Sequence, residues 1–455
     1  MTVTVLATAA ATAPIQQSAI LPLMGRLQTS LHASMTSVAW AFTISLLVGA
    51  VATPLLSRMG DMYGRRRMLL ISMSTMVAGS VLGALSTSLA SLIAARVLQG
   101  MSAAAVPLAI GIVRGILPRE KLPTGLGVVS ATMGIGVGGG LVLAGVIANV
   151  TSGYRVVFWT IAGIGAAVTA LAAFVVRDEG PATGGRLDLR GALLLSGVLV
   201  SLLLAISQGS SWGWSSGRVT GLFGAAVVFT IAWVYVERRA AEPLVDVSMI
   251  ADRGILSASI SSLLLGFALY GGFTLIPNFV QAPAEVGYGF DASVLQAGLF
   301  LLPTTVLMIV ASTQAGRLMQ RWAATTLVAV GSGLTALATG WLALFHDHRY
   351  DIYLATAVLG IGVGIAFAAM GTLAVENVSP DKTAVASAVN ALLRLVGGAV
   401  AGALTTAILV GDTLPQSTIP TEHAYQTGLI ICTIGAAVAG LASLVFSVPQ
   451  RKILG

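Results

Sequence analysis

The feature that most constrains this chain is a succession of long, almost uncharged apolar stretches that runs from one end to the other. The hydrocarbon core of a bilayer is about 30 Å thick, and a helix needs roughly 20 apolar residues to cross it. Hydrophobic residues make up 56% of the 455 residues. Charged residues make up only 9%, against about 25% in ordinary soluble domains. The sequence therefore predicts an integral membrane protein that crosses the bilayer many times.

Fourteen of these stretches are predicted to be spanning helices, because a backbone surrounded by lipid must satisfy its hydrogen bonds within its own segment. A membrane β-barrel is not expected, since barrel strands alternate in hydrophobicity over about ten residues. The predicted fold class is an all-α integral membrane protein with 14 transmembrane helices. The spans are predicted at residues 3–24, 36–57, 67–86, 91–116, 123–149, 156–176, 189–208, 218–236, 255–280, 293–313, 325–345, 352–375, 384–410 and 424–447.

The basic residues predict how the chain is oriented in the membrane. Most Lys and Arg residues fall in one set of loops, whereas the opposite set holds only Arg26, Arg155, Arg218 and Arg349. Loops rich in Lys and Arg stay in the cytoplasm, so both termini are predicted to be cytoplasmic. The same rule accounts for the net charge of +7 without a nucleic acid partner.

The two longest predicted cytoplasmic segments, residues 177–191 and 237–254, enclose one pair of spans. Six spans precede this pair and six follow it. The predicted domains are a six-helix bundle at residues 1–176, linkers with an inserted pair of spans at residues 177–254, and a second six-helix bundle at residues 255–455. Two such halves around a site at the membrane midplane are the plan of major facilitator transporters.

The charged loop "SRMGDMYGRRRMLL" (residues 57–70) joins the second and third spans. It resembles motif A of the major facilitator superfamily, G-x-L-A-D-R-x-G-R-R, although Ser57 replaces the first Gly and Met62 the first Arg. The resemblance implies that the loop latches the two halves in an outward-open state. Anchoring of the loop in the cytoplasm by its positive charge is the alternative interpretation. The motif A residues are Gly60, Asp61, Gly64, Arg65, Arg66 and Arg67.

The segment "LIAARVLQGMSAA" in the fourth span resembles motif B, L-x-x-x-R-x-x-Q-G, with Arg96, Gln99 and Gly100 at the matching positions. A charge within a spanning helix is expensive and indicates function. Arg96 and Gln99 are three residues apart and therefore share a helix face. The resemblance implies a role in proton coupling, whereas snorkelling of Arg96 to the membrane surface is the structural alternative.

The segment "GVGGGLVLAGVIA" in the fifth span resembles motif C of the antiporters, G-x-x-x-G-P-x-x-G-G. Gly136, Gly140 and Gly145 match, but Leu141 replaces the Pro and Ala144 replaces a Gly. The pattern has two interpretations, an antiport signature and general close packing of helices through small residues.

Residues 186–197 and 235–249 resemble the segments that flank the inserted spans of the fourteen-span drug:proton antiporter family. This resemblance extends over essentially the whole chain. It implies proton-driven export of small hydrophobic or amphipathic compounds by alternating access, without a cofactor. It also implies a monomer in the cytoplasmic membrane of a bacterium, with the lipid bilayer and the transported compound as its partners.

No carboxylate lies at the centre of any predicted span, and the family's acid in the first span is absent near Ala13. A buried anion that would offset the desolvation of a dication is therefore missing. A neutral, amphipathic or weakly anionic substrate fits better. The proton could bind at Asp61, Glu376 or an acid at the rim, or transport could be uncoupled. Candidate cavity residues are Gln16, Gln17, Tyr270, Asn278, Asn390 and Arg394.

Two other functions compete with drug export: transport of a lipid or metabolite on the same fold, and a membrane scaffold or sensor that no longer transports. The sequence contains no Walker A motif, so ATP is not expected to drive the protein directly. It shows no spacing of metal ligands and no nucleophile–base constellation, so neither a metal site nor an enzyme is expected.

Overall fold

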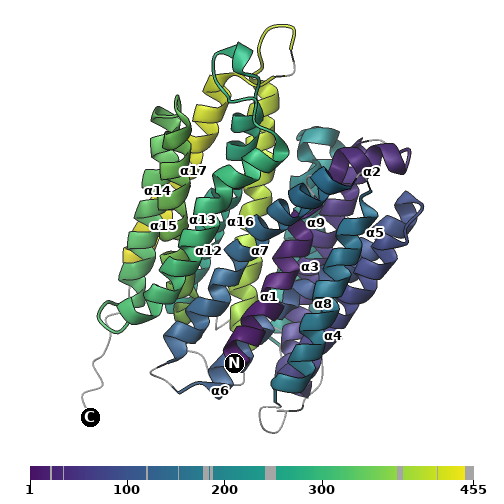
Figure 1. Ribbon diagram of the computed structural model, residues 1–455. Helices are drawn as coiled ribbons and strands as arrows, with labels where there is room; N and C mark the ends of the chain where they lie inside the picture. The colour runs from purple at the N-terminus through teal and green to yellow at the C-terminus, as the bar shows by residue number, and fades with distance from the viewer. Residues whose placement is uncertain are drawn as a thin grey trace.

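The computed structural model is a set of long helices that run alongside one another (Figure 1). The described residues hold no strand beyond one isolated bridge between Thr413 and Pro420. The predicted all-α fold is therefore confirmed. The structure describes residues 1–455 except 21–22, 34, 119–120, 152, 178–183, 185–187, 241–252, 377–382, 418 and 446–455.

The helices from α1 to α8 pack on one another and are named the N-terminal bundle. Contacts join α1 to α7 and α8, and α4 to α5 and α8. The fourth span changes from α-helix to a 3₁₀ turn, η2, and back again. The elements are α1 (Thr2–Ser18), α2 (Met24–Ser30), α3 (Met35–Tyr63), α4 (Arg65–Ala84), α5 (Leu89–Gly100), η2 (Met101–Ala104), α6 (Ala105–Ile116), α7 (Leu122–Val150) and α8 (Arg155–Val175).

The helices from α12 to α17 form a second group, named the C-terminal bundle. Contacts join α13 to α15, α14 to α15 and α17, and α12 to α16 and α17. Its apolar core lies inside this group, around fully buried residues such as Leu265, Leu275 and Val363. The elements are α12 (Arg253–Gln281), η3 (Ala284–Val286), α13 (Val294–Leu318), α14 (Ala324–Leu344), α15 (Arg349–Glu376), α16 (Thr383–Gly411) and α17 (Glu422–Val445).

Two helices that lie between the two bundles in the sequence, α9 (Leu189–Trp212) and α10 (Gly217–Glu237), pack as a pair. The Asp188 carboxylate caps α9 by accepting hydrogen bonds from the backbone N–H groups of Arg190 and Gly191. Helix α9 also contacts α3 and α16, and Leu195 and Leu199 join an apolar cluster with Leu47 of α3 and Val396 of α16. The pair therefore covers the line along which α3 and α16 meet.

Within the described residues, twelve helices are long and apolar enough to cross a membrane. They are α3, α4, the continuous α5–α6 segment, α8, α9, α10 and α12 to α17. Helix α1 has 17 residues, and α7 contributes a shorter apolar segment, Gly138–Ile147. Each of the fourteen predicted ranges overlaps a helix. The count of fourteen spans goes beyond the twelve and stays a prediction.

The bundles meet along two lines, one between α7 and α13 and the other between α3 and α16. Glycine makes the first of these contacts close. A Cβ atom at Gly127 of α7 would overlap the backbone carbonyl of Ser312 on α13, and one at Gly138 would overlap the Thr305 hydroxyl. Small residues allow this approach in the membrane, where dispersion and packing drive helix association. The space between the two lines holds the principal cavity.

Candidate functional site

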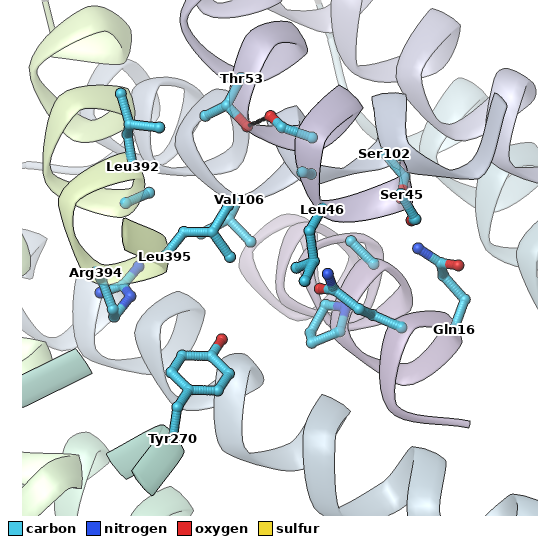
Figure 2. A pocket seen from close by; sticks show the side chains of 17 residues that line it. Gln16, Ser45, Leu46, Thr53, Ser102, Val106, Tyr270, Leu392, Arg394 and Leu395 are labelled. Atoms are coloured by element: carbon cyan, nitrogen blue, oxygen red, sulfur yellow. Dashed lines mark hydrogen bonds between the residues drawn. The ribbon is translucent and has the colours of Figure 1, made fainter. Parts of the chain in front are cut away.

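A cavity lies between the two bundles (Figure 2). Residues of α1, α3, η2 and α6 line it on one side, and residues of α12 and α16 line it on the other. Its accessible volume is about 60 Å³, which is below the range of about 300–1,000 Å³ usual for small-molecule sites. Both bundles thus bound a narrow space, which would have to widen by separation of the bundles to hold a small molecule.

Neutral polar groups face this cavity from the N-terminal bundle. The Thr53 hydroxyl donates a hydrogen bond to the Gly49 carbonyl at 2.6 Å, the dashed line in Figure 2. The Ser45 hydroxyl has no hydrogen-bond partner among the described residues. Sequence reasoning missed both residues, although they lie eight positions apart on one helix and therefore share a face. The polar lining residues of this bundle are Gln16, Gln17, Ser45, Thr53 and Ser102.

Tyr270 of α12 and Arg394 of α16 are the polar residues that the C-terminal bundle contributes to the cavity. Figure 2 shows the Tyr270 hydroxyl and the Arg394 guanidinium on the same side of the cavity, with Leu392 and Leu395 beside them. A cation and a hydroxyl next to apolar side chains make this wall amphipathic.

Four of the six predicted cavity residues are brought together in this cavity: Gln16, Gln17, Tyr270 and Arg394. A fifth, Asn390, lines a second, smaller cavity together with Ser387 and Arg394. Its amide donates to the Ala258 carbonyl at 3.2 Å and accepts from the Ser262 hydroxyl at 3.0 Å. Asn390 therefore joins α16 to α12. It lines the second cavity beside Arg394, which also lines the principal cavity.

The sixth predicted cavity residue, Asn278, does not line either cavity. It is exposed, and its amide donates to the Thr274 carbonyl of its own helix at 2.7 Å. Asn278 follows Tyr270 by eight residues, which is roughly 12 Å along a helix. The structure does not bring Asn278 together with the other predicted cavity residues, because that displacement carries the amide past the cavity.

Motif B forms a buried polar network inside the N-terminal bundle. Arg96 and Gln99 are fully buried. The Arg96 guanidinium donates to the side-chain carbonyls of Gln16 and Gln99, both at 2.7 Å, and its Nε donates to the Ala41 carbonyl at 3.0 Å. The Gln99 amide donates to the Ser80 hydroxyl at 2.9 Å. The network thus joins α1, α3, α4 and α5, and Arg96 does not snorkel to a surface.

The third motif B residue, Gly100, lies where the fourth span becomes a 3₁₀ turn. A Cβ atom at Gly100 would lie 2.7 Å from the Ser45 carbonyl oxygen of α3, so only glycine allows this approach. A stretch of 3₁₀ helix inside a long helix often marks a hinge. Here it lies beside the cavity, and it carries the lining residue Ser102.

Arg394 is 6% exposed and has a very different environment from Arg96. Its guanidinium lies over the ring of Phe367, 4.7 Å from the centroid. Its Nε atom is buried without a hydrogen-bond acceptor among the described residues. Arg394 lines both cavities, so its charge borders the open space.

Motif A joins the end of α3 to the beginning of α4. Asp61 is 5% exposed, and its carboxylate accepts a hydrogen bond from Arg65 Nε at 2.8 Å. Arg65 also donates to the Gly111 carbonyl of α6 at 3.2 Å, and Arg66 donates to the Ala173 carbonyl of α8 at 2.7 Å. These described contacts join four helices of the N-terminal bundle.

The motif A glycines and Arg67 have distinct positions. Gly64 separates α3 from α4 with a φ of 106°, a conformation that other residues adopt only with strain. A Cβ atom at Gly60 would overlap the Leu108 side chain of α6, so Gly60 allows α3 to approach the fourth span. Arg67 is exposed. The loop is thus a tight turn in which Arg65 and Arg66 contact neighbouring helices and Arg67 lies at the surface.

Motif C packs α7 against α1. A Cβ atom at Gly140 would overlap the Ile15 carbonyl, and one at Gly136 would lie 2.9 Å from the Ala11 carbonyl. Gly145 instead faces Leu295 of α13, and the nearest atom to a Cβ there would be 3.5 Å away. Gly136 and Gly140 are therefore required for close packing, whereas Gly145 has room for a methyl group.

Among the residues that the structure describes, no carboxylate lines either cavity. Asp61 is buried in motif A, and the side chain of Glu376, the last residue of α15, lies outside the described part of the chain. The described residues also contain no group of three His, Cys, Asp or Glu side chains that could hold a metal ion. The charge that borders the cavities is thus positive.

Two histidine–carboxylate pairs of the C-terminal bundle lie near the ends of α14 and α16 and the beginning of α17. His346 Nε2 lies 2.8 Å from a carboxylate oxygen of Glu422. His423 Nδ1 lies 3.0 Å from a carboxylate oxygen of Asp412. The hydrogen bond from His423 holds the pKa of the Asp412 carboxyl below its usual value. These pairs form the rim of the bundle and do not reach the cavity.

Two helix bundles that enclose a cavity, with twelve helices fit to cross a bilayer, define a multi-pass membrane transporter. The chain belongs to the Major Facilitator Superfamily, whose family model matches residues 6–402. Members of this family are transporters and not enzymes. The fold is also that of a crystal structure of the human organic anion transporter MFSD10 (TETRAN), with a TM-score of 0.68 and 98% of each chain covered. The two sequences are 15% identical, so this likeness concerns the fold alone.

Bacterial proteins are more similar in sequence. The tetracenomycin C resistance and export protein of Streptomyces glaucescens is 28% identical over 398 residues, covering 86% of this chain and 72% of that protein. The multidrug resistance protein Stp of Mycobacterium tuberculosis is 28% identical over 388 residues, covering 84% of this chain and 71% of that protein. The MFS-type transporter YvkA of Bacillus subtilis is 25% identical over 395 residues, covering 86% of both.

Proposed function

We propose that this protein is a secondary active exporter of small hydrophobic or amphipathic compounds. The observation that carries the proposal is a cavity bounded by both bundles, with polar groups set among apolar side chains. Relative tilting of the bundles would open such a cavity to one side of the membrane and then to the other. The printed names of two relatives, an export protein and a multidrug resistance protein, support export as the direction.

The proposal includes proton coupling and membership of the fourteen-span drug:proton antiporter family. In this arrangement α1 and α7 are spans in addition to the twelve, and the bundles correspond to residues 1–176 and 255–455 on either side of the inserted segment 177–254. The close packing of α1 on α7 through Gly136 and Gly140 supports α1 and α7 as integral parts of the first bundle. The protein would act as a monomer in the cytoplasmic membrane of a bacterium, with both termini in the cytoplasm.

The motifs have different roles in this proposal. Motif A is the conformational latch, and the buried Asp61–Arg65 pair supports an assignment in which charge holds the ends of α3, α4, α6 and α8 together. Motif B couples the proton to the cavity through the contact between Arg96 and Gln16, because Gln16 also lines the cavity. A ligand that binds one arrangement better than another shifts their equilibrium.

Transport by purified protein in liposomes tests the proposal. A fluorescent amphiphile is followed with and without an imposed pH gradient, beside protein-free liposomes and liposomes treated with a protonophore. We expect protein-dependent movement that the gradient accelerates and the protonophore abolishes. Equal movement with and without protein across a panel of amphiphiles and labelled phospholipids would contradict transport. Movement that ignores the gradient would contradict proton coupling.

A further inference from the structure

Arg394 is a buried cation whose hydrogen bonds are incomplete among the described residues. The side chain is 6% exposed, and its Nε atom has no hydrogen-bond acceptor among the described residues. An ionised group removed from water is strongly destabilising unless it is paired and hydrogen-bonded. The ring of Phe367 at 4.7 Å supplies one favourable contact, but an aromatic face accepts only part of a guanidinium's donor capacity.

The described residues around the two cavities offer Arg394 no anionic partner, so such a partner would have to enter from the cavities. No carboxylate of the described residues lines either cavity, and Arg394 lines both. The Ser45 hydroxyl in the principal cavity and the Ser387 hydroxyl in the second cavity are also buried without hydrogen-bond partners among the described residues. Tyr270 presents its hydroxyl to the same space as Arg394 (Figure 2). Among the described residues, the two cavities therefore combine the cation of Arg394 and the hydroxyl of Tyr270 with no negatively charged group.

We infer that Arg394 binds an anionic group of the transported compound, and that the substrates are amphipathic organic anions. The description of the bound compound as a substrate rests on the proposed function, but the binding site itself does not depend on transport. A guanidinium forms paired hydrogen bonds with a carboxylate or another oxyanion, and these bonds are stronger where water is excluded.

The rest of the cavity wall is largely apolar, as the body of such a molecule requires. Val106, Leu46, Leu392 and Leu395 are among the lining residues. A cationic compound of the same size would meet the charge of the buried Arg394, where repulsion between like charges is strong. The cavity therefore selects for negative charge over positive charge at a given hydrophobicity.

The test measures binding of matched fluorescent probes to purified full-length protein. Dansyl-leucine carries a carboxylate, dansyl-leucinamide has the same body without charge, and dansyl-cadaverine carries an ammonium group. We expect the wild-type protein to bind dansyl-leucine most tightly of the three. Arg394→Gln is expected to weaken dansyl-leucine binding by about 30-fold or more and to leave dansyl-leucinamide binding within about twofold.

Two further variants keep the test decisive if Arg394→Gln folds poorly. Arg394→Lys keeps the charge and loses the paired hydrogen-bond geometry, so it should retain preference for the anion with weaker binding. Tyr270→Phe removes only a hydroxyl and should weaken binding of dansyl-leucine several-fold, by about the effect of one charge-assisted hydrogen bond. Equal binding of the three probes by the wild type, or unchanged dansyl-leucine binding in Arg394→Gln, would overturn the inference.

The oxyanion could belong to a free compound or to the headgroup of an anionic lipid. Competition with phosphatidylglycerol, and with phosphatidylcholine as the zwitterionic control, distinguishes these sources while keeping the anion site. Displacement of dansyl-leucine by phosphatidylglycerol alone identifies a lipid headgroup as an occupant, and no displacement by either identifies the free organic anion. The same preparations in liposomes distinguish failure of the proposed function from failure of the anion site. Anion binding without transport would contradict the proposed function and would still support the anion site at Arg394.

Discussion

Arg96 and Arg394 are both buried arginines within spanning helices, and they use their charge in opposite ways. Arg96, in the N-terminal bundle, donates to two glutamine side chains and a backbone carbonyl, and its Nη2 is the one guanidinium nitrogen that is buried without an acceptor among the described residues. Arg394, in the C-terminal bundle, has a ring contact, no described acceptor for its Nε, and a place on the walls of two cavities. The difference indicates that the two arginines have different roles. Arg96 joins helices of the N-terminal bundle through hydrogen bonds, whereas Arg394 leaves a positive charge beside the cavities for a ligand.

The largest expected effect separates the two arginines by stability. Arg96→Gln leaves the facing groups of Gln16 and Gln99 with fewer partners, and we expect it to lower the free energy of unfolding by about 3 kcal/mol. Arg394→Gln removes an uncompensated buried charge, so we expect no loss of stability or a small gain. Thermal unfolding of both purified variants in the same detergent measures the contrast. Equal destabilisation of both would show that Arg394 also has a structural partner.

The second expected effect concerns the latch. Asp61→Asn removes the charge that pairs with Arg65 inside the N-terminal bundle, and we expect transport in liposomes to fall roughly tenfold through a shifted conformational equilibrium. Binding of a probe in the cavity should change little, because Asp61 does not line it. Arg67→Gln is the matched control, since Arg67 belongs to the same motif but is exposed. Equal loss of transport in both variants would show that the effect does not depend on the buried Asp61–Arg65 pair.

A third effect compares packing within a bundle with packing between bundles. Gly140→Ala forces α1 and α7 apart, because the new methyl group would overlap the Ile15 carbonyl, and we expect a loss of stability of about 1–3 kcal/mol. Gly145→Ala, with its nearest neighbour at 3.5 Å, should change stability by less than about 0.5 kcal/mol. Thermal unfolding distinguishes the two. A large loss for Gly145→Ala would mean that α7 and α13 are as tightly fitted there as α1 and α7 are at Gly140.

The positions of the helices could be predicted from the sequence, because long apolar stretches with charged ends have few other folds. Spacing along a helix also predicts shared faces: Ser387, Asn390 and Arg394 follow one another at intervals of three and four residues and line the second cavity. The same spacing applies to Ser45 and Thr53 on α3, but hydroxyl side chains in a helix commonly bond to a carbonyl of their own helix, as Thr53 does with Gly49, so their sequence pattern does not distinguish a cavity residue.

The rest of the site depends on contacts between helices that the sequence does not encode locally. The pairing of Arg96 with Gln16 joins residues 80 positions apart, and neither motif B nor the first span specifies it. Asn278 shows the converse, since it is polar and near Tyr270 in sequence but lies beyond the cavity along α12. Arg96 has several hydrogen-bond acceptors and Arg394 has a ring contact among the described residues, and this distinction required the packed structure.

The smallest expected effect concerns the rim of the C-terminal bundle. The pKa of Asp412 is lowered by its hydrogen bond with His423, so this pair stabilises the fold above the ordinary carboxyl pKa. That contribution is lost as the pH falls through the lowered pKa, below about pH 4. Asp412→Asn should remove a small part of the acid-induced loss of thermal stability, because the pair is exposed. Asp291→Asn, another exposed rim acid, is the control and should leave the acid profile unchanged.

Access of the cavity from the two sides of the membrane tests the central claim most directly. Gln17 lines the cavity, and Cys432 is the only cysteine and is buried, so Gln17→Cys combined with Cys432→Ala gives a single cavity thiol. A membrane-impermeant thiol reagent is applied to right-side-out and inside-out vesicles, with and without an imposed pH gradient. The account predicts that the gradient raises the labelling rate from one side and lowers it from the other. Rates that rise or fall together on both sides, or a thiol that reacts from neither, would contradict alternating access.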